Sequence, residues 1–489
     1  MTETEIRNLV RQIQQRNTED RTTEVKAAAI DCPKKLYDTF SSFSNQDEGG
    51  RIVFGLDEKQ KFKVIGVYDP ADLQKQINNK SLQMVPPIRP EMSLATIEGM
   101  PVVVAEITGT DYCDRPVYYR EAGIHKGSYI RIGDSDEHMT AYEIYRYEAY
   151  RKSLKEDQRP VVDGWILQNR PLLDQYLLEV KNGRPNLFSH VSDDQILSLN
   201  KIEVDSKPSL TGLLVFSKYP QSAFPGLGIT AVVVPGTSMG DHLQDGERFN
   251  DNQRIEGSLP EMLEETMRFV ERNMKHRTII DESGRRTDRT EYPLRAVREA
   301  VLNALIHRDY SRYTEGTPIQ IRLFSDRMEI ISPGGLYGGF PVSRLGKDSP
   351  ESRNSTLIKT LEFLKVTENR YSGIPTMKQE MEAAGLPLPE FDDNGRSFTV
   401  TFRNHTPEDD AVLEGLSSLQ KEVAEFCLIP RSRKEIADHF QKSYAYTSNS
   451  ILLPMISAGY LLEDHKVGRT VYLITEPDLG KQLRTDAAK

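Results

Sequence analysis

The stretch Arg298-Glu-Ala-Val-Leu-Asn-Ala-Leu-Ile-His-Arg-Asp-Tyr310 decides how the central part of this chain is interpreted. Its apolar residues recur at helical spacing, and Glu299, Asn303 and His307 are each about one turn apart. A helix therefore holds a carboxylate, an amide and an imidazole in one row. Polar groups on an otherwise apolar helix cost stability unless partners satisfy them. The row predicts a site for a phosphate-bearing ligand.

A glycine-rich loop follows this helix in the sequence. Two strands are predicted at residues 318–324 and 327–331, and they lead into Ser332-Pro-Gly-Gly-Leu-Tyr-Gly-Gly339. Glycines let backbone N–H groups approach a ligand closely, which is how such loops hold phosphate. Gly334 and Gly335 therefore strengthen the prediction of a phosphate site. Upstream, the apolar run Gly212-Leu-Leu-Val-Phe216 is expected to be a strand. Ser258 is expected to cap a helix over residues 259–273.

Length and composition limit the classes of protein to which the chain can belong. At 489 residues it is expected to form three or four domains, and its 37% hydrophobic and 28% charged residues are typical of a water-soluble protein. No segment resembles a signal peptide or a membrane span, and the three scattered cysteines suggest neither disulfides nor structural zinc. We expect a cytoplasmic protein without membrane contact. The net charge of −10 requires any nucleic-acid contact to be local.

The N-terminal part is predicted to be a mixed α and β domain with a characteristic order of landmarks. Glu-Val-Lys ends at Lys26, Gly-Gly-Arg-Ile-Val-Phe-Gly-Leu-Asp ends at Asp57, and Lys-Gly-Ser-Tyr-Ile-Arg-Ile-Gly-Asp begins at Lys126. A strand is expected over residues 51–56, with residues 63–67 as its hairpin partner. This order resembles the AlbA-type DNA-binding domain of bacterial Schlafen-like proteins over about residues 15–146. The resemblance implies contact with nucleic acid.

In some Schlafen relatives three carboxylates form a metal-dependent nuclease, and the resemblance places them here at Glu19, Glu24 and Asp57. Clustered carboxylates can hold a divalent ion that activates water. The alternative is structural: Glu19 is solvated, Glu24 pairs with Lys26 or another cation, and Asp57 starts a turn. Basic residues of the same domain are candidate phosphate contacts, namely Arg51, Lys126 and Arg131.

The central region carries a second resemblance. The row on the central helix, Asp-Arg-Met-Glu-Ile-Ile-Ser-Pro-Gly-Gly-Leu336, Ser352-Arg-Asn354 and Ser-Gly-Ile374 together resemble the RecG-like helicase C-terminal family, which belongs with the GHKL-type ATPases. The resemblance covers about residues 256–404. It implies ATP and Mg²⁺ as cofactors, with Asn303 holding Mg²⁺, Glu299 orienting water, and His307, Gly334, Gly335 and Gly373 lining the nucleotide site.

Two departures from the family pattern leave alternatives open. Tyr371 stands where a glycine is expected, and its ring would obstruct a phosphate. The loop after Ser332 also lacks the Asp-x-Gly-x-Gly order of GHKL enzymes, so the aspartate that reads adenine has no counterpart. The competing interpretation is a structural polar cluster that joins the central helix to Arg353 and Asp309. No Gly-x-x-x-x-Gly-Lys-Ser/Thr phosphate loop accompanies these motifs.

The C-terminal part resembles a winged helix. Helices are expected over residues 419–427, 432–440 and 446–457, followed by a β-ribbon that ends near residue 474. The expected recognition helix carries no charge, so its candidate base contacts are Ser448, Asn449 and Ser450. Phosphate contacts are expected from Arg431, Arg433, Lys434 and Lys442, or from Lys466 and Arg469 in the wing. The alternative role for this module is dimerisation.

The sequence therefore predicts a multidomain α+β protein. We expect a mixed α/β AlbA-like domain at 1–150, a connecting α/β region at 151–255, a GHKL-like α/β sandwich at 256–405 and a winged helix at 410–480. The favoured function is an ATP-responsive DNA-binding regulator of transcription. We expect it to form a homo-oligomer and to prefer DNA to RNA. The alternative is a metal-dependent nuclease that acts on RNA or DNA in defence against foreign nucleic acid.

Overall fold

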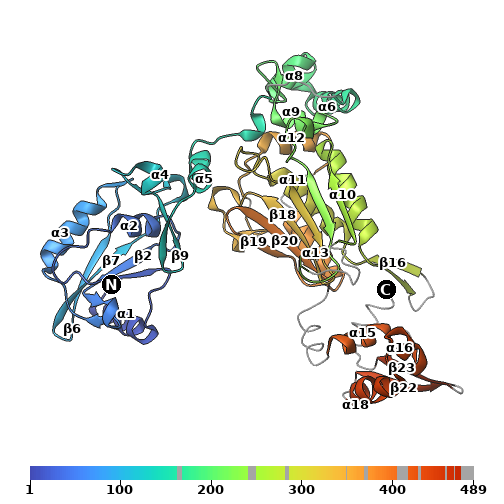
Figure 1. The fold of residues 1–489 in the computed structure, drawn as a ribbon. Coiled ribbons are helices and arrows are strands. Elements are labelled where there is room, and N and C mark those ends of the chain that lie inside the picture. The colour runs from blue at the N-terminus through green and yellow to red at the C-terminus, as the bar shows by residue number, and fades with distance from the viewer. Residues whose placement is uncertain are drawn as a thin grey trace. The chain divides into compact units, whose positions relative to one another are not determined.

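The computed structural model describes most of the chain, which is a multidomain α+β protein (Figure 1). The described residues are 1–161, 168–240, 249–280, 286–348, 350–367, 373–404, 417–427, 431–457, 460–466 and 469–474. They divide into two compact units: residues 1–154 with 337–340, and residues 155–336 with 341–489. None of the described helices has the length and apolar character that crossing a membrane requires.

The first unit is built on a four-stranded sheet with the order β1-β2-β7-β6. Strands β1 (Thr23–Lys26) and β2 (Gly50–Phe54) are parallel, whereas β7 (Met100–Ile107) is antiparallel to both β2 and β6 (Glu91–Ile97). Successive side chains of a strand point to opposite faces of the sheet. On β2 this sends Ile52 and Phe54 into one hydrophobic core and Val53 into another.

Helices cover both faces of this sheet. Helix α1 (Glu3–Arg16) buries Ile6, Leu9, Val10 and Ile13 in the core that contains Val53. Helices α2 (Tyr37–Ser44) and α3 (Pro70–Ser81) cover the opposite face. The remaining elements are β3 (Leu56–Asp57), η1 (Glu58–Gln60), β4 (Lys63–Val64), β5 (Met84–Val85), η2 (Tyr112–Asp114), β8 (Tyr118–Tyr119), α4 (Gly123–Gly127), β9 (Tyr129–Ile132), β10 (Ser135–His138), α5 (Ala141–Arg151) and η5 (Tyr337–Gly339).

The second unit is built on a six-stranded sheet with the order β14-β13-β17-β18-β20-β19. Strands β13 (Ile229–Val233) and β17 (Ile319–Leu323) are parallel, and every other neighbouring pair is antiparallel. The other strands are β14 (Asp251–Ile255), β18 (Arg327–Pro333), β19 (Glu390–Asp393) and β20 (Ser397–Arg403). Two strands thus come from the predicted connecting region, so the sheet runs across the boundary expected at residue 255.

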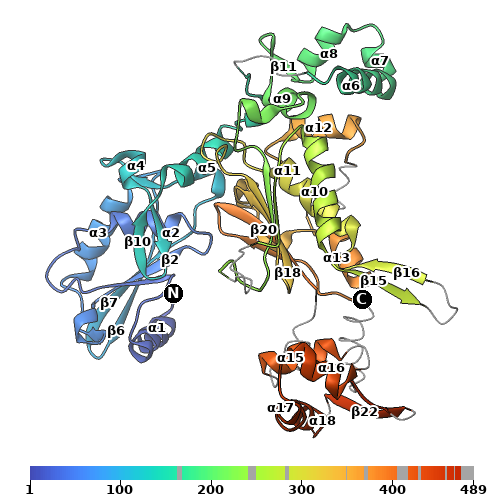
Figure 2. The ribbon, with the colours of Figure 1, turned by 45° about the vertical axis from the view of Figure 1, so that its right-hand side comes forward.

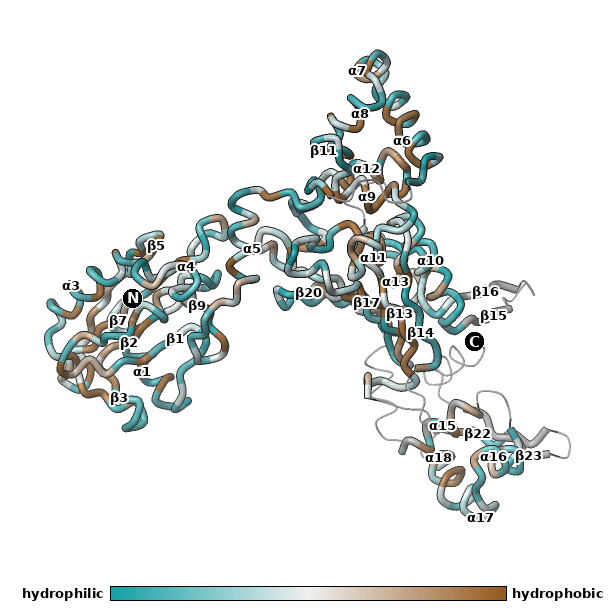
Figure 3. Tube along the Cα trace, turned by 45° about the horizontal axis from the view of Figure 1, so that its top comes forward, coloured by the Kyte–Doolittle hydropathy of each residue, from teal (hydrophilic) through white to brown (hydrophobic). Residues whose placement is uncertain are grey.

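Helices α10 (Leu259–Asn273), α11 (Leu294–His307) and α13 (Gly373–Ala383) lie side by side on one face of this sheet (Figure 2). The expected helix over 259–273 is confirmed, with Ser258 and Glu261 forming a capping box. The inner strand β13 is coloured mostly brown and the edge strand β14 mostly teal in Figure 3, because the edge strand carries polar residues. The core between sheet and helices fixes α11, the helix with the polar row.

One predicted strand in this unit is wrong. Residues 212–216 were expected to be extended, but they belong to helix α9 (Leu210–Phe216), whose seven residues are all buried. A short apolar run has no polar face from which its periodicity can be determined. Ser209 caps this helix by accepting a hydrogen bond from the backbone N–H of Gly212 at 3.0 Å.

The remaining elements of the second unit are mostly short. They are η3 (Glu156–Gln158), α6 (Arg170–Gly183), α7 (Pro185–Phe188), α8 (Asp193–Leu199), β11 (Glu203–Val204), β12 (Lys207–Pro208), η4 (Pro220–Ser222), β15 (His276–Ile280), β16 (Arg286–Thr290), η6 (Val342–Arg344) and α12 (Ser355–Phe363). The hairpin of β15 and β16 was not predicted from the sequence.

The described C-terminal residues form helices and a small antiparallel sheet. Helix α15 (Ser418–Phe426) is followed by β21 (Arg431–Ser432), α16 (Arg433–His439) and α17 (Tyr444–Tyr446). The last helix continues as a π-helical turn over Thr447–Leu452 and as α18 (Leu453–Ser457). Strands β22 (Leu461–Lys466) and β23 (Arg469–Ile474) then pair with β21 in the order β21-β23-β22. The winged-helix assignment of this region stays a prediction.

Candidate functional sites

The polar row lies on α11, as the sequence predicted. The helix begins after Pro293, and its apolar side chains at positions such as Val297, Ala300 and Ala304 are buried in the core. Glu299 and Asn303 remain half-buried on another side of the same helix. The row is therefore held by a well-packed helix, while the side chains of Glu299 and Asn303 can still contact a neighbouring element.

That neighbouring element is the start of α13, at Gly373. A Cβ atom added to Gly373 would lie 3.0 Å from Nδ2 of Asn303 and 3.2 Å from Oε2 of Glu299, closer than nearly all real Cβ contacts. The backbone of Gly373 thus approaches both side chains as closely as a residue without a side chain can. Gly373, which is distant in the sequence, is thus brought to Glu299 and Asn303, the residues with which it was predicted to share one site.

His307, the third member of the row, ends α11 and has an exposed side chain. Although His307 keeps accessible surface, desolvation by neighbouring protein atoms, and secondarily the positive charge of Arg353, lower the pKa of its imidazole to about 4. The imidazole is therefore neutral at physiological pH, so it can accept a hydrogen bond as well as donate one. Its contact with a nucleotide stays a prediction.

The first glycine pair of the loop is held by neighbouring side chains. Gly334 has a φ of +94°, and an added Cβ would collide with the Cβ of Asp309. Arg353 pairs with Asp309 at 3.2 Å through Nη1, and its Nη2 donates a hydrogen bond to the carbonyl of Gly335. These contacts agree with the alternative interpretation of the sequence, a structural polar cluster that joins the central helix to Arg353 and Asp309. The approach of Gly334 and Gly335 to a nucleotide stays a prediction.

The sequence did not indicate how the motif Ser352-Arg-Asn354 would act. Asn354 is buried, and its Nδ2 donates to the carbonyls of Ile306 at 2.8 Å and Arg308 at 2.7 Å. It thereby satisfies carbonyl groups at the end of α11, where a helix leaves them without partners. The position of the motif after the glycine loop pointed to a role in the same site. Its role as a cap for α11 became clear only from the packing of the structure. Tyr371 lies outside the described residues.

The second glycine pair of the loop belongs to the first unit. Gly338 and Gly339 have φ values of +69° and +66°. An added Cβ on Gly338 would lie 2.6 Å from the ring of Tyr150, and one on Gly339 would collide with the ring of Tyr112. Both glycines are therefore explained by close packing on tyrosines of this unit.

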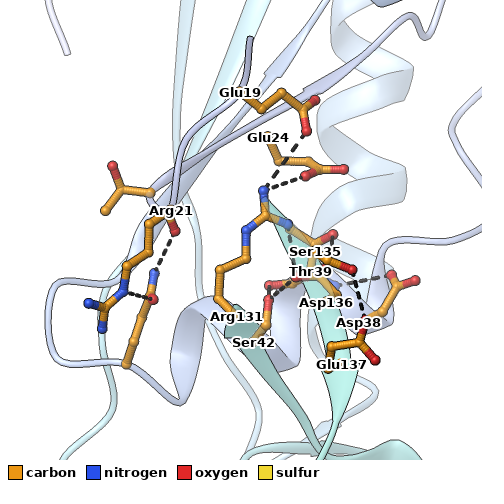
Figure 4. Close-up of polar contacts among 12 residues, drawn as sticks. Glu19, Arg21, Glu24, Asp38, Thr39, Ser42, Arg131, Ser135, Asp136 and Glu137 are labelled. Carbon is orange, nitrogen blue, oxygen red and sulfur yellow. Dashed lines mark hydrogen bonds and ion pairs between the residues drawn. The ribbon is translucent and has the colours of Figure 1, made fainter. Parts of the chain in front are cut away.

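In the first unit, Arg131 is the centre of a buried charge cluster (Figure 4). Its side chain is only 1% exposed, and its guanidinium lies 2.9 Å from Glu24, 3.0 Å from Asp136 and 3.9 Å from Glu19. Asp136 also accepts hydrogen bonds from the hydroxyls of Thr39 at 2.7 Å and Ser42 at 2.6 Å. The prediction that Arg131 contacts phosphate is not supported by this arrangement, because carboxylates already surround the guanidinium.

The two glutamates of the cluster are in different situations. Glu24 is buried and pairs with Lys26 as well as with Arg131, as the structural alternative predicted. Glu19 is not solvated: its side chain is 13% exposed, and it accepts a hydrogen bond from the backbone N–H of Val25 at 2.7 Å. Burial and the neighbouring charge of Glu24 raise the pKa of Glu19 to about 7.

Asp57 makes its contacts in a turn and not with Arg131. Its carboxylate caps the turn η1, accepting from the backbone N–H of Lys59 at 3.0 Å and from Nε2 of Gln60 at 2.6 Å. Across the described ranges, no group of three or more His, Cys, Asp or Glu side chains is suited to hold a metal ion. A guanidinium that already contacts the carboxylates of Glu19 and Glu24 does not fit a divalent ion bound to the same oxygens.

The other predicted nucleic-acid contacts are scattered. Arg51 is half-buried on β2, opposite Glu106 of β7, whereas Lys126 is exposed on α4. In the C-terminal region Lys434 and Asn449 are exposed, and Arg433 and Ser448 are half-buried. Lys466 and Arg469 pair across the turn between β22 and β23, but their side chains lie outside the described part of the chain.

Comparison with known proteins agrees with both resemblances of the larger domains. Residues 19–140 match the family described as "Schlafen, AlbA_2", and residues 316–402 match the family described as "Putative ATP-dependent DNA helicase recG C-terminal". The predicted resemblance is thus confirmed for these two regions. Together they indicate a function related to nucleic acid and dependent on ATP. Among curated proteins, none matches the chain.

Two solved structures are similar to the chain. A crystal structure of a protein from Corynebacterium diphtheriae is 18% identical, covers 94% of this chain and 92% of that chain, and has a TM-score of 0.39. The solution structure of the N-terminal domain of a RecG-related protein from Nitrosomonas europaea is 27% identical. It covers 27% of this chain and 92% of that chain, with a TM-score of 0.23.

Proposed function

We propose that this protein is an ATP-responsive DNA-binding protein that regulates transcription. The observation that carries the proposal is the meeting of Gly373 with Asn303 and Glu299, which unites three residues expected at one nucleotide site. The match of residues 316–402 to the RecG-type C-terminal family supports ATP as the ligand. The match of residues 19–140 to the Schlafen AlbA_2 family supports nucleic acid as the partner.

Each polar group in this site has a role that follows from its chemistry. The amide oxygen of Asn303 is a hard donor that suits Mg²⁺, which would neutralise phosphate charge when bound with the nucleotide. The carboxylate of Glu299 accepts a proton or a hydrogen bond from water. The backbone of Gly373 packs against both groups with no side chain between them. We assign Asn303 to the metal and phosphates, and Glu299 to the orientation of water.

ATP would act as a switch by binding one arrangement of the chain more tightly than another. The glycine loop supports this idea through its connectivity, since Gly334 and Gly335 belong to the second unit and Gly338 and Gly339 to the first. A ligand that changes the first pair therefore acts on a segment continuous with the second pair. We propose that DNA affinity changes in response.

Nucleotide binding by the full chain tests the site. Isothermal titration with ATP and Mg²⁺ is expected to show binding that Asn303→Ala weakens at least tenfold, because a polar partner of the ligand is lost. Asn252→Ala is a matched control, since Asn252 is an exposed amide on the edge strand β14. Equal affinity in the wild type and in Asn303→Ala would remove the nucleotide role of the row.

DNA binding tests the response. The anisotropy of a labelled duplex is expected to give different affinities with and without ATP in the wild type, and the same affinity under both conditions in Asn303→Ala. Because linkage is reciprocal, the duplex should change ATP affinity by the same factor. If ATP binds but leaves duplex affinity unchanged, the site is a nucleotide site without the proposed switch.

A further inference from the structure

Two tyrosines at the start of the last helix have exposed rings. Tyr444 is 54% exposed and Tyr446 is 46% exposed, although both lie in a module with its own buried core. Leu453, on the same helix, is 55% exposed. Large apolar side chains that stay accessible together on one element are typical of an interaction surface. The sequence had singled out the polar residues of this helix, Ser448 and Asn449, and not its aromatic ones.

A cation accompanies each ring. The guanidinium of Arg433 lies 5.7 Å from the ring centroid of Tyr444, and the ammonium of Lys442 lies 6.0 Å from that of Tyr446. Both distances are within the range of a cation–π contact. Positive charge is thus placed directly beside each aromatic face, although the helix from Tyr446 to Ile456 carries no charge.

The segment that carries these rings contains more basic than acidic residues. Residues 431–446 contain four Arg or Lys and two acidic residues. One of the acids, Glu435, turns its carboxylate to Ser432, accepting from the backbone N–H at 2.7 Å and from the hydroxyl at 2.6 Å. The other, Asp438, is exposed on α16. The surface therefore combines aromatic rings with a local excess of positive charge on a chain whose net charge is negative.

We propose that Tyr444 and Tyr446 stack on unpaired bases of a nucleic-acid strand, while Arg433 and Lys442 contact its phosphates. Exposed rings next to cations are the combination by which proteins hold single strands, because every base has a face for stacking and every nucleotide has a phosphate. A duplex keeps its bases stacked on one another and offers no free face to a ring. This inference rests on the proposed function and names its substrate as unpaired nucleotides.

The helix geometry determines how a strand would engage the two rings. Residues two apart on a helix do not face each other, so Tyr444 and Tyr446 form two separate stacking surfaces, each with its own cation. A strand that crosses the start of the helix can use one ring on each side. The π-helical turn over 447–452 follows directly, and such turns are frequent at functional sites.

The test on the unmodified chain compares single strands that differ only in their bases. Labelled oligo(dT) is expected to bind at least tenfold more tightly than a strand of the same length and charge with abasic sites, and more tightly than a duplex. Oligo(rU) serves as a second arm that distinguishes RNA from DNA. The phosphates are the same in the two DNA strands, so the difference reports stacking.

Variants assign the stacking to the two rings. Tyr444→Ala and Tyr446→Ala should each weaken oligo(dT) binding about tenfold, whereas Tyr444→Phe and Tyr446→Phe, which keep the rings, should stay within about twofold. Tyr219→Ala removes a ring with a similar exposure of 41% from another part of the second unit and should have no effect. Because both rings are exposed, circular dichroism should show unchanged folding.

Three results would overturn the inference. They are equal binding of oligo(dT) and the abasic strand, Ala variants that bind as the wild type does, and binding of duplex alone. In the last case the DNA-binding proposal stands and only the substrate class is wrong. If neither duplex nor single strand binds, the proposed function fails together with this inference. Retention of duplex binding in the Ala variants, with loss of oligo(dT) binding, supports the inference and separates the two surfaces.

Discussion

Replacement of Arg131 by methionine tests whether the buried charge cluster holds the first unit together. The guanidinium pairs with Glu24 at 2.9 Å and with Asp136 at 3.0 Å, and its side chain is 1% exposed. Removing one partner of a buried ion pair leaves the other charge without compensation, which typically costs about 3–5 kcal/mol. Glu24 keeps Lys26, and Asp136 keeps two hydroxyl donors. We therefore expect the lower end of that range, about 3 kcal/mol.

Hydrogen exchange followed by mass spectrometry suits this measurement, because it reports the stability of individual segments in a chain with several domains. Peptides that contain β1 and β9 should exchange on the order of a hundredfold faster in Arg131→Met, since each factor of ten corresponds to about 1.4 kcal/mol. Arg131→Lys keeps the charge without the planar donor arrangement. Its exchange rate should lie between those of the wild type and Arg131→Met.

The matched control is Arg16→Met. Arg16 pairs with Asp20 at 3.3 Å in the same unit, but its side chain is 62% exposed, so the loss should be within about 1 kcal/mol. Combining Arg131→Met with Glu24→Gln should recover part of the stability, because one uncompensated carboxylate is removed. If Arg131→Met exchanges at the same rate as Arg16→Met, the cluster does not support the fold and the reasoning is refuted.

Two further predictions concern Glu19 and Gly373. The pKa of Glu19 rises from its ordinary value of 4.5 to about 7, so its protonated form stabilises the fold below about pH 4.5, and this contribution is lost as the pH rises through 7. Calorimetric melting should therefore show that Glu19→Gln is more stable than the wild type at pH 8, by at most about 3 kcal/mol. At pH 4.5 the two proteins should be similarly stable. If they also melt at the same temperature at pH 8, the assignment is wrong. Gly373→Ala should weaken ATP binding by about 1–3 kcal/mol, because the new Cβ displaces Asn303 and Glu299. The control is Gly316→Ala, whose Cβ meets no atom within 4 Å and which should leave ATP binding unchanged. Titration of each variant with ATP measures the two affinities.

The long, strongly patterned elements could be predicted from the sequence alone. The helix over 259–273 has a cap, an amphipathic pattern and a clear end, and all three agree with the structure. Residues 212–216 could not be assigned in this way, because a fully buried helix and a buried strand share the same apolar composition. The row on α11 was recognised because Glu299, Asn303 and His307 are regularly spaced. Its contact with Gly373 depended on how α13 packs, which local pattern does not encode.

Arg131 shows a different limit. On a strand between Ile130 and Ile132 a basic residue is expected to point to solvent, yet its side chain is buried. The partner could have been anticipated from the turn at Gly133 and Asp134, which pairs Arg131 with Asp136 across the hairpin of β9 and β10. The pairing with Glu24 could not, because it requires β1 to lie beside this hairpin. A charge is informative about a binding site only when the charges around it are also known.

The contacts of Arg131 within the first unit bear on two functions predicted for this unit, a metal-dependent nuclease and nucleic-acid binding. A divalent ion at Glu19 and Glu24 would have to displace the guanidinium that now lies 2.9 Å from Glu24 and 3.9 Å from Glu19, and the displaced cation would lose Asp136 as well. Such an exchange costs a buried ion pair before any chemistry begins. A phosphate that approached Arg131 would meet the same carboxylates and be repelled by them. The cluster is therefore better suited to stabilising the first unit than to binding a metal or a nucleic acid.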